Sequence, residues 1–103
     1  MTQQHAQYIG IQAIIRCRDA GIHYGTVRDI DGRTVELANA RRIWRWRGAL
    51  TLTHLASETE ALDSGWTRIT PALPSYLLLD ACEVLPLSAG AAARLDAVPP
   101  WTK

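Results

Sequence analysis

Phenylalanine is absent from this 103-residue chain, and Lys103 is its only lysine. Nearly all of the positive charge is therefore arginine, and the large aromatic side chains are tryptophan and tyrosine. Arginine presents a planar, bidentate set of donors, so this composition favours geometrically defined contacts with anions over a diffuse basic surface. A GC-rich genome would produce the same arginine bias.

Cysteine is scarce as well, and long apolar runs are missing. Cys17 and Cys82 both fall in apolar, strand-like stretches, and the first residues lack the basic-then-apolar order of a signal peptide. We therefore expect two buried, reduced thiols in a cytoplasmic protein. No apolar run approaches the length of a membrane span, so no membrane association is expected.

The charge balance differs between the two halves of the chain. The net charge is +1, but residues 16–47 hold eight arginines against four acids, a balance of +4. From residue 48 onward two arginines and one lysine face six acids, a balance of −3. A general DNA- or RNA-binding protein usually carries a large basic excess, so that class is disfavoured. A local anion pocket, or self-association of a basic face with an acidic one, fits the balance better.

The alternation of apolar and polar residues predicts a series of antiparallel strands. Asp31-Gly32 is the strongest turn signal between two of them. Residues 38–40 are expected to break the chain between two separate strands, and residues 76–85 to form one nearly continuous apolar strand. The predicted strands span residues 8–18, 23–30, 33–37, 41–46, 66–69 and 76–85.

Two short helices complete the prediction. One is expected over residues 50–57, followed by an acidic loop at 58–65. The other follows the capping residue Ser88 and ends near Val98, with Ala91 and Leu95 on its apolar face. With an apolar fraction of 48%, residues 1–103 are expected to form one compact α+β domain. Its core element would be a twisted antiparallel β-sheet of about five or six strands, with two short helices.

The sequence lacks the residue patterns of common catalytic and metal sites. His5, His23 and His54 lie far apart in sequence and lack zinc-site spacings, so no metal or cofactor is expected. Asp80 and Glu83 lie three apart on a predicted strand, on opposite faces, and do not form a carboxylate pair. No glycine-rich loop precedes a lysine. The sequence therefore indicates a binding protein rather than an enzyme.

The densest chemistry lies in residues 39–49, where four arginines and two tryptophans fall between Arg41 and Arg47. Guanidinium groups pair with phosphate oxygens, and indole faces stack on bases, so this run suits an anionic ligand that carries a ring. An edge strand with core tryptophans and solvated arginines explains the same pattern. On a strand, one face would carry Arg41, Ile43 and Arg45, and the other Arg42, Trp44 and Trp46.

A second candidate region is the glycine-flanked turn at residues 21–25. His23 and Tyr24 could stack on a ligand or hydrogen-bond to it, and Gly25 would let the ligand approach the backbone closely. Arg28 follows on the next strand and could project into the same region. The alternatives are an ordinary turn and a solvated strand arginine.

Arg94 and Trp101, near the end of the chain, could complete a pocket or an interface. Arg94 would otherwise only favour the C-terminus of its helix, and Trp101 would only cover the sheet.

At residues 20–25 and 39–49 the chain resembles the first-described family of Thoeris anti-defence proteins, which are small phage proteins. The matching stretches are Ala-Gly-Ile-His-Tyr-Gly and Asn-Ala-Arg-Arg-Ile-Trp-Arg-Trp-Arg-Gly-Ala. Weaker similarity follows at residues 52–56 and 98–102. The chain departs from the family in its lack of phenylalanine and in Arg45 and Arg47, where relatives vary.

The resemblance implies a sponge that binds cyclic ADP-ribose isomers without cleaving them, in the cytoplasm of an infected bacterium. It also implies a homo-oligomer, from dimer to hexamer, and in some members a site for cyclic di- or trinucleotides. On this hypothesis Arg41, Arg42 and Arg45 pair with phosphates, and Trp44, Trp46 or Tyr24 stacks on adenine. The full set of expected ligand-binding residues is His23, Tyr24, Gly25, Arg28, Arg41, Arg42, Trp44, Arg45, Trp46 and Arg94.

Two other functions explain parts of the pattern. The chain could be a small oligomeric interaction protein whose Arg/Trp strand forms a subunit or partner interface, since arginine and tryptophan are frequent interface anchors. Weak nucleic-acid binding would predict a steep salt dependence, and the near-zero net charge argues against it.

Overall fold

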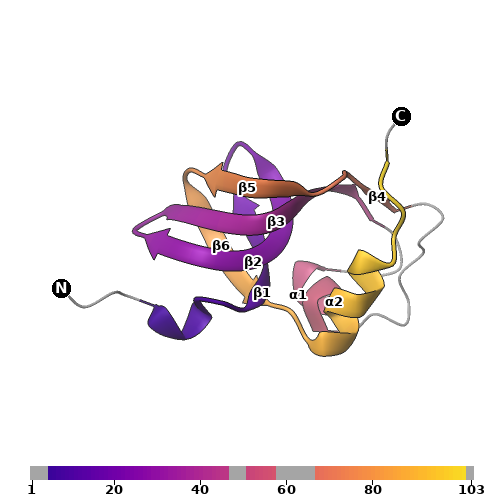
Figure 1. The fold of residues 1–103 in the computed structure, drawn as a ribbon, viewed down its shortest axis with the longest axis horizontal. Helices are drawn as coiled ribbons and strands as arrows, with labels where there is room; N and C mark the ends of the chain where they lie inside the picture. Colours follow the sequence, from indigo (N-terminus) through magenta and orange to yellow (C-terminus); the bar gives the residue numbers. More distant parts are fainter. Residues whose placement is uncertain (1–4, 47–50, 58–66, 102–103) are drawn as a thin grey trace.

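The computed structural model describes residues 5–46, 51–57 and 67–101, and it confirms an α+β domain with a six-stranded antiparallel sheet and two helices (Figure 1). A single 3₁₀ turn precedes the first strand. The elements are η1 (Ala6–Tyr8), β1 (Gln12–Cys17), β2 (Gly21–Asp31), β3 (Thr34–Arg45), α1 (Leu52–Ser57), β4 (Arg68–Ile69), β5 (Leu73–Leu78), β6 (Ala81–Pro86) and α2 (Ala89–Asp96).

The sheet has the strand order β4-β3-β2-β1-β6, and β5 pairs with β3. β3 is long enough to carry both partners, because β5 pairs with residues 35–40 and β4 with residues 43–45. Only two residues, Leu79 and Asp80, join β5 to β6. Because β5 pairs with β3 and β6 with β1, this short link joins opposite sides of the sheet, and the sheet curls on itself (Figure 1). Asp80, at φ 59°, makes the turn, and its carbonyl accepts from Arg18 N at 3.1 Å.

The curled sheet has a separate hydrophobic core on each face. The core inside the curl includes Ile15, Val27 and Leu37. The core between the sheet and the helices includes Ile14 and Leu95. β1 is buried on both faces because it lies inside the sheet and under the helices. This position explains why Ile14 interrupts the alternation of apolar and polar residues in that strand.

Helix α2 follows its sequence signals closely. The Ser88 side chain accepts a hydrogen bond from Ala91 N at 3.0 Å, which is the predicted N-cap. Ala91, Leu95 and Val98 are all buried, so the predicted apolar face is confirmed. The predicted loop at residues 58–65 lies outside the described residues.

The predicted break at residues 38–40 is a bulge within one continuous strand. Thr26 pairs with Ala38 and Tyr24 with Arg41, so Gly25 alone lies opposite two residues of β3. Asn39 takes up the extra residue at φ 53°. A bulge bends a strand without ending it, and the sequence pattern of the two cases is similar.

Three other predictions were wrong in detail. Residues 76–85 do not form one strand, because the left-handed turn at Asp80 divides them between β5 and β6. The first strand is shorter than predicted, since residues 6–8 form the turn η1. Cys17 is buried as expected, but Cys82 is exposed on β6.

Gly25 provides a test of the bulge. A Cβ there would lie 2.9 Å from the carbonyl oxygen of Ala38 and 3.0 Å from Cα of Ala40. Both atoms belong to the backbone, so Gly25→Ala should lower the free energy of unfolding by more than about 2 kcal/mol. Gly32→Ala is the control, because a Cβ at Gly32 would meet no atom within 4 Å. The φ of +60° at this position should cost the alanine variant about 1 kcal/mol of stability. Urea titration of both variants checks this, and an equal loss would contradict the close approach at Gly25.

Candidate functional site

Arg41 is buried, with 8% of its surface exposed, and its guanidinium group is fully hydrogen-bonded within the chain. Arginine has five N–H donors, and five acceptors surround this one. The acceptors are Thr70 O at 2.7 Å from Nε, Tyr24 Oη at 3.1 Å and Leu95 O at 3.2 Å from Nη1, and Val98 O at 3.0 Å and Ile69 O at 3.4 Å from Nη2. No donor is left for a phosphate, so the predicted ligand role of Arg41 is corrected to a structural one.

The Arg41 network joins four segments that are distant in sequence. It links β3 to Tyr24 of β2, to the carbonyl groups of residues 69 and 70 in and after β4, and to those of residues 95 and 98 at the end of α2 and just after it. Carbonyl groups at a helix C-terminus have no partner within the helix, so a buried helix end requires donors from elsewhere. A charged donor with a fixed fork geometry meets this need better than a neutral one.

Tyr24 belongs to the same network and cannot stack on a ligand. Its side chain is 1% exposed, and its hydroxyl donates to Asp96 Oδ1 at 2.9 Å while accepting from Arg41. Burial raises the pKa of Tyr24 to about 12, although the nearby Arg41 charge acts in the opposite direction. Gly25 is also buried and faces β3 rather than solvent. The predicted ligand roles of both residues are therefore corrected.

Arg28 and Arg94 lie away from the Arg/Trp run. Arg28 lies near the β2–β3 hairpin, where it pairs with Glu36 at 3.6 Å between Nη1 and Oε2. Arg94 is exposed in the last turn of α2, which fits the helix-end role that the sequence also allowed. The structure does not bring either residue together with the exposed part of β3.

The exposed Arg42 and Trp44, the half-buried Arg45 and the distant Trp101 form one surface of two indoles and two arginines, which we call the indole–arginine surface. Trp44 is 53% exposed and Trp101 39% exposed. Their rings stack with centroids 4.7 Å apart and an interplanar angle of 29°. The Arg45 Cζ atom lies 5.6 Å from the centre of the Trp44 ring, within the range of a cation–π contact.

Trp46 does not share this surface, although the alternation predicted that it would lie with Trp44. β3 ends at Arg45, so its two-residue period does not extend to the next position. Trp46 is half-buried and packs against the core beneath the helices.

Trp101 reaches the surface because the chain after α2 runs beside β4. Ile69 forms a parallel bridge with Pro100, and Trp101 N donates to Ile69 O at 2.8 Å. Arg41 binds the carbonyl of Val98 three residues earlier. From the sequence, Trp101 was expected to complete a pocket or an interface, or only to cover the sheet, because nothing local in Pro-Pro-Trp indicates which strand it joins.

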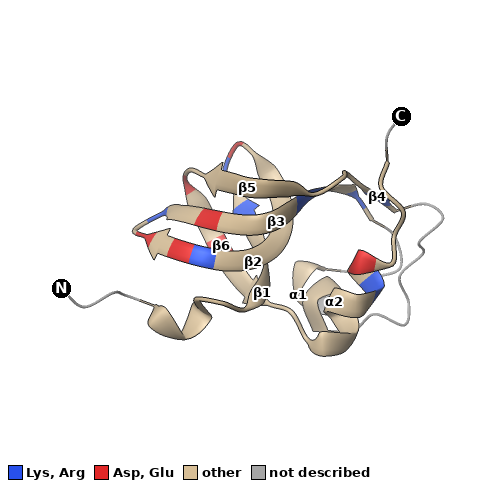
Figure 2. Ribbon diagram, viewed as in Figure 1, with Lys and Arg blue, Asp and Glu red and all other residues tan. Residues whose placement is uncertain are grey.

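Charge is distributed unevenly over the described residues (Figure 2). Three exposed arginines have acidic partners, in the ion pairs Arg16–Glu83 at 2.8 Å, Arg28–Glu36 at 3.6 Å and Arg33–Asp80 at 3.1 Å. Arg42 has no ion-pair or side-chain hydrogen-bond partner within the described part of the chain. Arg42 therefore presents a positive charge that no acidic side chain of the described residues neutralises.

The Arg42 side chain lies across the start of β2. A Cβ at Gly21 would be 3.3 Å from Arg42 Nη2, and Gly21 has a φ of +85° that favours glycine. The backbone N–H of Arg42 donates to Thr70 Oγ1 at 2.9 Å. Glycine at position 21 thus leaves room for the guanidinium group, which gives this residue a positioning role.

His23 lies beneath Arg42 rather than on the surface. The two residues are register partners on β2 and β3, and His23 is 1% exposed with its ring 4.7 Å from that of Tyr76. Its Nδ1 atom is buried and has no hydrogen-bond partner in the described structure. Burial, followed by the Arg42 charge, lowers the pKa of His23 to about 4. At neutral pH the imidazole is a neutral packing group, and no ligand reaches it in this arrangement.

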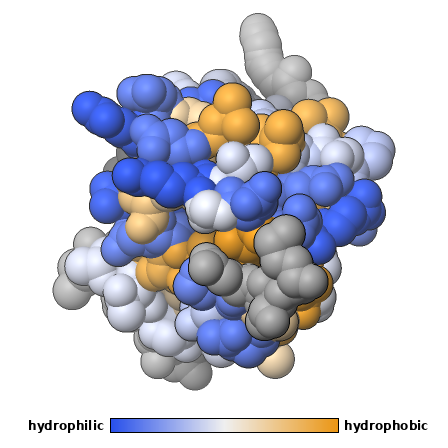
Figure 3. Space-filling model, turned by 90° about the vertical axis from the view of Figure 1, so that its left-hand side faces the viewer, coloured by the Kyte–Doolittle hydropathy of each residue, from blue (hydrophilic) through white to orange (hydrophobic). Residues whose placement is uncertain are grey.

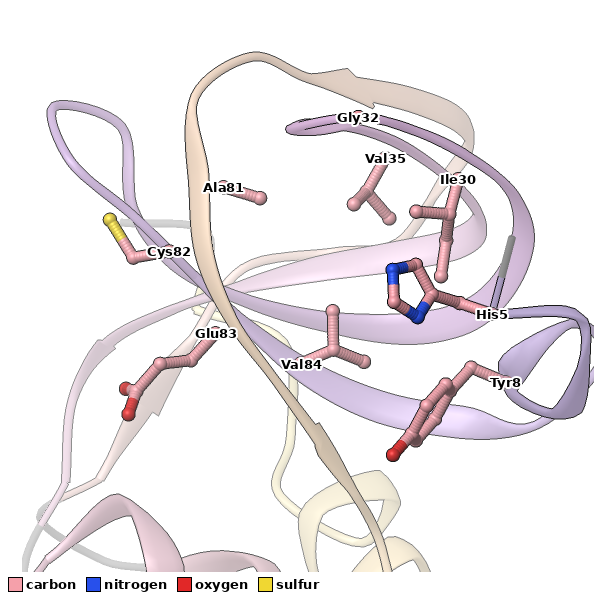
Figure 4. A pocket seen from close by; sticks show the side chains of 9 residues that line it. All are labelled: His5, Tyr8, Ile30, Gly32, Val35, Ala81, Cys82, Glu83 and Val84. Carbon is pink, nitrogen blue, oxygen red and sulfur yellow. The ribbon is translucent and has the colours of Figure 1, made fainter. Parts of the chain in front are cut away.

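A separate pocket of about 270 Å³ lies between η1, the β2–β3 hairpin and β6 (Figure 4). Figure 4 shows Ile30, Val35 and Val84 directed into it, while the Cys82 thiol and the Glu83 carboxylate point away. Glu83 is already paired with Arg16. This pocket has no arginine or lysine in its lining and contains no residue of the Arg/Trp run. The indole–arginine surface is therefore the better candidate for an anionic ligand.

Replacing Arg41 tests its structural role. Arg41→Lys keeps the charge but loses two of the five donors and the fork, so buried carbonyl groups remain unpaired. The free energy of unfolding should fall by about 3 kcal/mol or more. The matched control is Arg42→Lys, which alters an exposed arginine and should change it by less than about 0.5 kcal/mol. Chemical denaturation measures both, and equal stability of the two variants would rule out the network.

The buried His23 predicts a pH dependence of stability. The pKa of this histidine is about 4 in the folded chain and 6.5 in the unfolded chain, so the unfolded chain binds more protons between these values. The stabilisation is present above pH 6.5 and is lost as the pH falls toward 4, by an amount of about 3 kcal/mol. Between pH 7 and pH 4 the melting temperature of His23→Phe should fall less than that of the wild type. A parallel pH dependence of the two proteins would exclude this origin.

Among the described helices, none has the length and apolar character needed to cross a membrane. The described residues also contain no group of three or more His, Cys, Asp and Glu side chains placed to hold a metal ion. No curated protein and no solved structure was found to match the chain. A family model does match, over residues 10–95. The chain belongs to that family, which is described as a domain of unknown function, DUF6948.

Proposed function

We propose that this protein is a phage anti-defence sponge, which binds cyclic ADP-ribose-type immune signals in the cytoplasm of the infected bacterium without cleaving them. The observation that carries the proposal is the indole–arginine surface, where two exposed, stacked indoles lie on and beside a strand that presents an arginine without an ionic partner. Indole faces bind bases, and guanidinium groups bind phosphates. Cyclic di- and trinucleotides carry the same groups and form the second ligand class.

The distribution of positive charge favours one local anion-binding site over a generally basic surface. The net charge of the chain is only +1, and three other exposed arginines of the described residues have acidic partners. A ligand that carries two phosphates would be drawn to Arg42, beside the indoles. Three of its four residues, Arg42, Trp44 and Arg45, also lie within residues 39–49, the stretch that carries the resemblance to Thoeris anti-defence proteins.

The proposal divides the predicted residues into two groups. Arg42 and Arg45 contact phosphate groups, and the indole of Trp44 provides the face on which a base stacks. Arg41 and Tyr24 lie one layer below, where they hold β3 against β4 and α2. The mechanism is mass action: an abundant protein that binds the signal more tightly than the effector does lowers the free signal concentration.

Assembly into a homo-oligomer, from dimer to hexamer, is the second part of the proposal. Tight capture of a small ligand needs an enclosed site, whereas Trp44 is half exposed in a single chain. β5 carries three exposed leucines at or just after its strand, Leu73, Leu77 and Leu79, with exposed fractions of 49%, 62% and 63%. Figure 3 shows apolar surface near the top of the molecule, on the side where β5 ends. Exposed apolar patches of this kind often mark interfaces.

The alternative function is a small interaction protein whose indole–arginine surface is itself a subunit or partner interface. Stacked tryptophans and arginines are typical interface anchors, so the same side chains serve either role. The two functions differ in their response to small ligands, since only the sponge is stabilised by a nucleotide.

A thermal-shift panel of cyclic ADP-ribose isomers and cyclic di- and trinucleotides tests the proposal. A ligand present at 100 times its dissociation constant should add about 2.7 kcal/mol to the free energy of unfolding, and so raise the melting temperature. Arg42→Ala should weaken binding by about tenfold or more, because a hydrogen bond to a charged group is lost. Arg94→Ala removes an exposed arginine that lies elsewhere and should bind as the wild type does.

The bound ligand should be recovered unchanged after heat denaturation of the complex. A hydrolysed product would overturn the sponge, and the absence of any shift across the panel would favour the interface function.

A further inference from the structure

The ring of Trp44 already has two partners in the ligand-free chain. Trp101 stacks on it with centroids 4.7 Å apart, and the Arg45 guanidinium lies 5.6 Å from its centre. Offset aromatic pairs have centroid separations of about 4.5–7 Å, so Trp101 fills the position that a stacked base would take. A base can use this face of Trp44 only if Trp101 leaves it.

We propose that Trp101 is a placeholder: it occupies the ring-binding face of Trp44 in the free protein and is displaced by the planar base of an anionic nucleotide. This inference rests on the proposed function, and it names the face on which the ligand ring binds. The arginines on either side of Trp44 would then meet the phosphates of the incoming ligand.

Trp101, not Trp44, is the ring that moves. Trp44 lies within β3 between the buried Ile43 and Arg45, so its position is fixed by the sheet. The backbone of Trp101 is also held, by its hydrogen bond to Ile69 O. Among the described residues, its side chain stacks on Trp44, and its indole N–H has no hydrogen-bond partner there. A rotation of the side chain alone would therefore clear the face, with no strand or helix displaced.

When a ligand base displaces Trp101, one ring stack on Trp44 is lost and another is formed. Stacking contributes little net binding when an internal ring must first be removed, so most of the affinity must come from phosphate contacts. Removing the internal ring relieves the competition. Trp101→Ala should therefore bind the ligand more tightly than the wild type, by up to about tenfold, which is the range expected for one aromatic pair. Trp101→Phe keeps a smaller ring on Trp44 and should fall between the two.

Circular dichroism of the full chain reports the stack directly, because two stacked indoles give an exciton couplet in the far ultraviolet. The wild type should show the couplet and lose it in step with binding of a cyclic ADP-ribose isomer, followed by calorimetric titration. Trp101→Ala should lack the couplet from the start and still melt cooperatively. Trp46→Phe, which alters an indole in the core beneath the helices, should keep both the couplet and its ligand-dependent loss.

The outcomes separate this inference from the proposed function. If the ligand binds while the couplet persists, or if Trp101→Ala binds more weakly, Trp101 is a second contact to the ligand and the placeholder is wrong while the sponge stands. If neither the wild type nor Trp101→Ala binds any ligand of the panel, the proposed function fails and the placeholder fails with it.

Discussion

The hydrogen bonds of the buried Arg41 guanidinium are the interaction on which the rest of this structure depends. One side chain satisfies carbonyl groups from β4, from the end of α2 and from the segment that follows it, together with the hydroxyl of Tyr24. A buried guanidinium is tolerated only when its donors are paired, and here all five are. The hydrogen bond from Arg41 to Val98 O also fixes the chain three residues before Trp101. The buried network therefore helps to place Trp101 against Trp44 on the surface.

The alternation of residues along β3 separates this structural layer from the proposed ligand layer. Arg41 and Ile43 point toward the helices, while Arg42 and Trp44 are exposed on the other face. Neighbouring arginines in one motif therefore have different roles. The donors of Arg41 are satisfied by backbone carbonyls and the Tyr24 hydroxyl, whereas Arg42 retains donors for an external anion. The sequence predicted that the run would divide between two faces, but not which face was buried.

Local signals predicted the parts of the fold that depend on nearby residues. The Ser88 cap, the apolar face of α2 and the β2–β3 turn at Asp31-Gly32 follow from spacing within a few positions. The bulge at Asn39 and the turn at Asp80 were missed, because a single left-handed residue leaves little trace in an apolar pattern. The hydrogen-bond network of the buried Arg41 was missed for a different reason. The acceptors around Arg41 lie 17 to 57 positions away in sequence, and only the folded chain brings them together.

On the proposed function, Arg41 serves the fold and Arg42 serves the ligand. NMR of the arginine side-chain Nε–Hε resonances, on ¹⁵N-labelled protein titrated with a cyclic ADP-ribose isomer, distinguishes the two roles. The Arg42 resonance should shift on binding, while the Arg41 resonance should stay in place and its proton should exchange slowly with solvent. A large shift of the Arg41 resonance with an unchanged Arg42 resonance would show that the two roles are assigned wrongly.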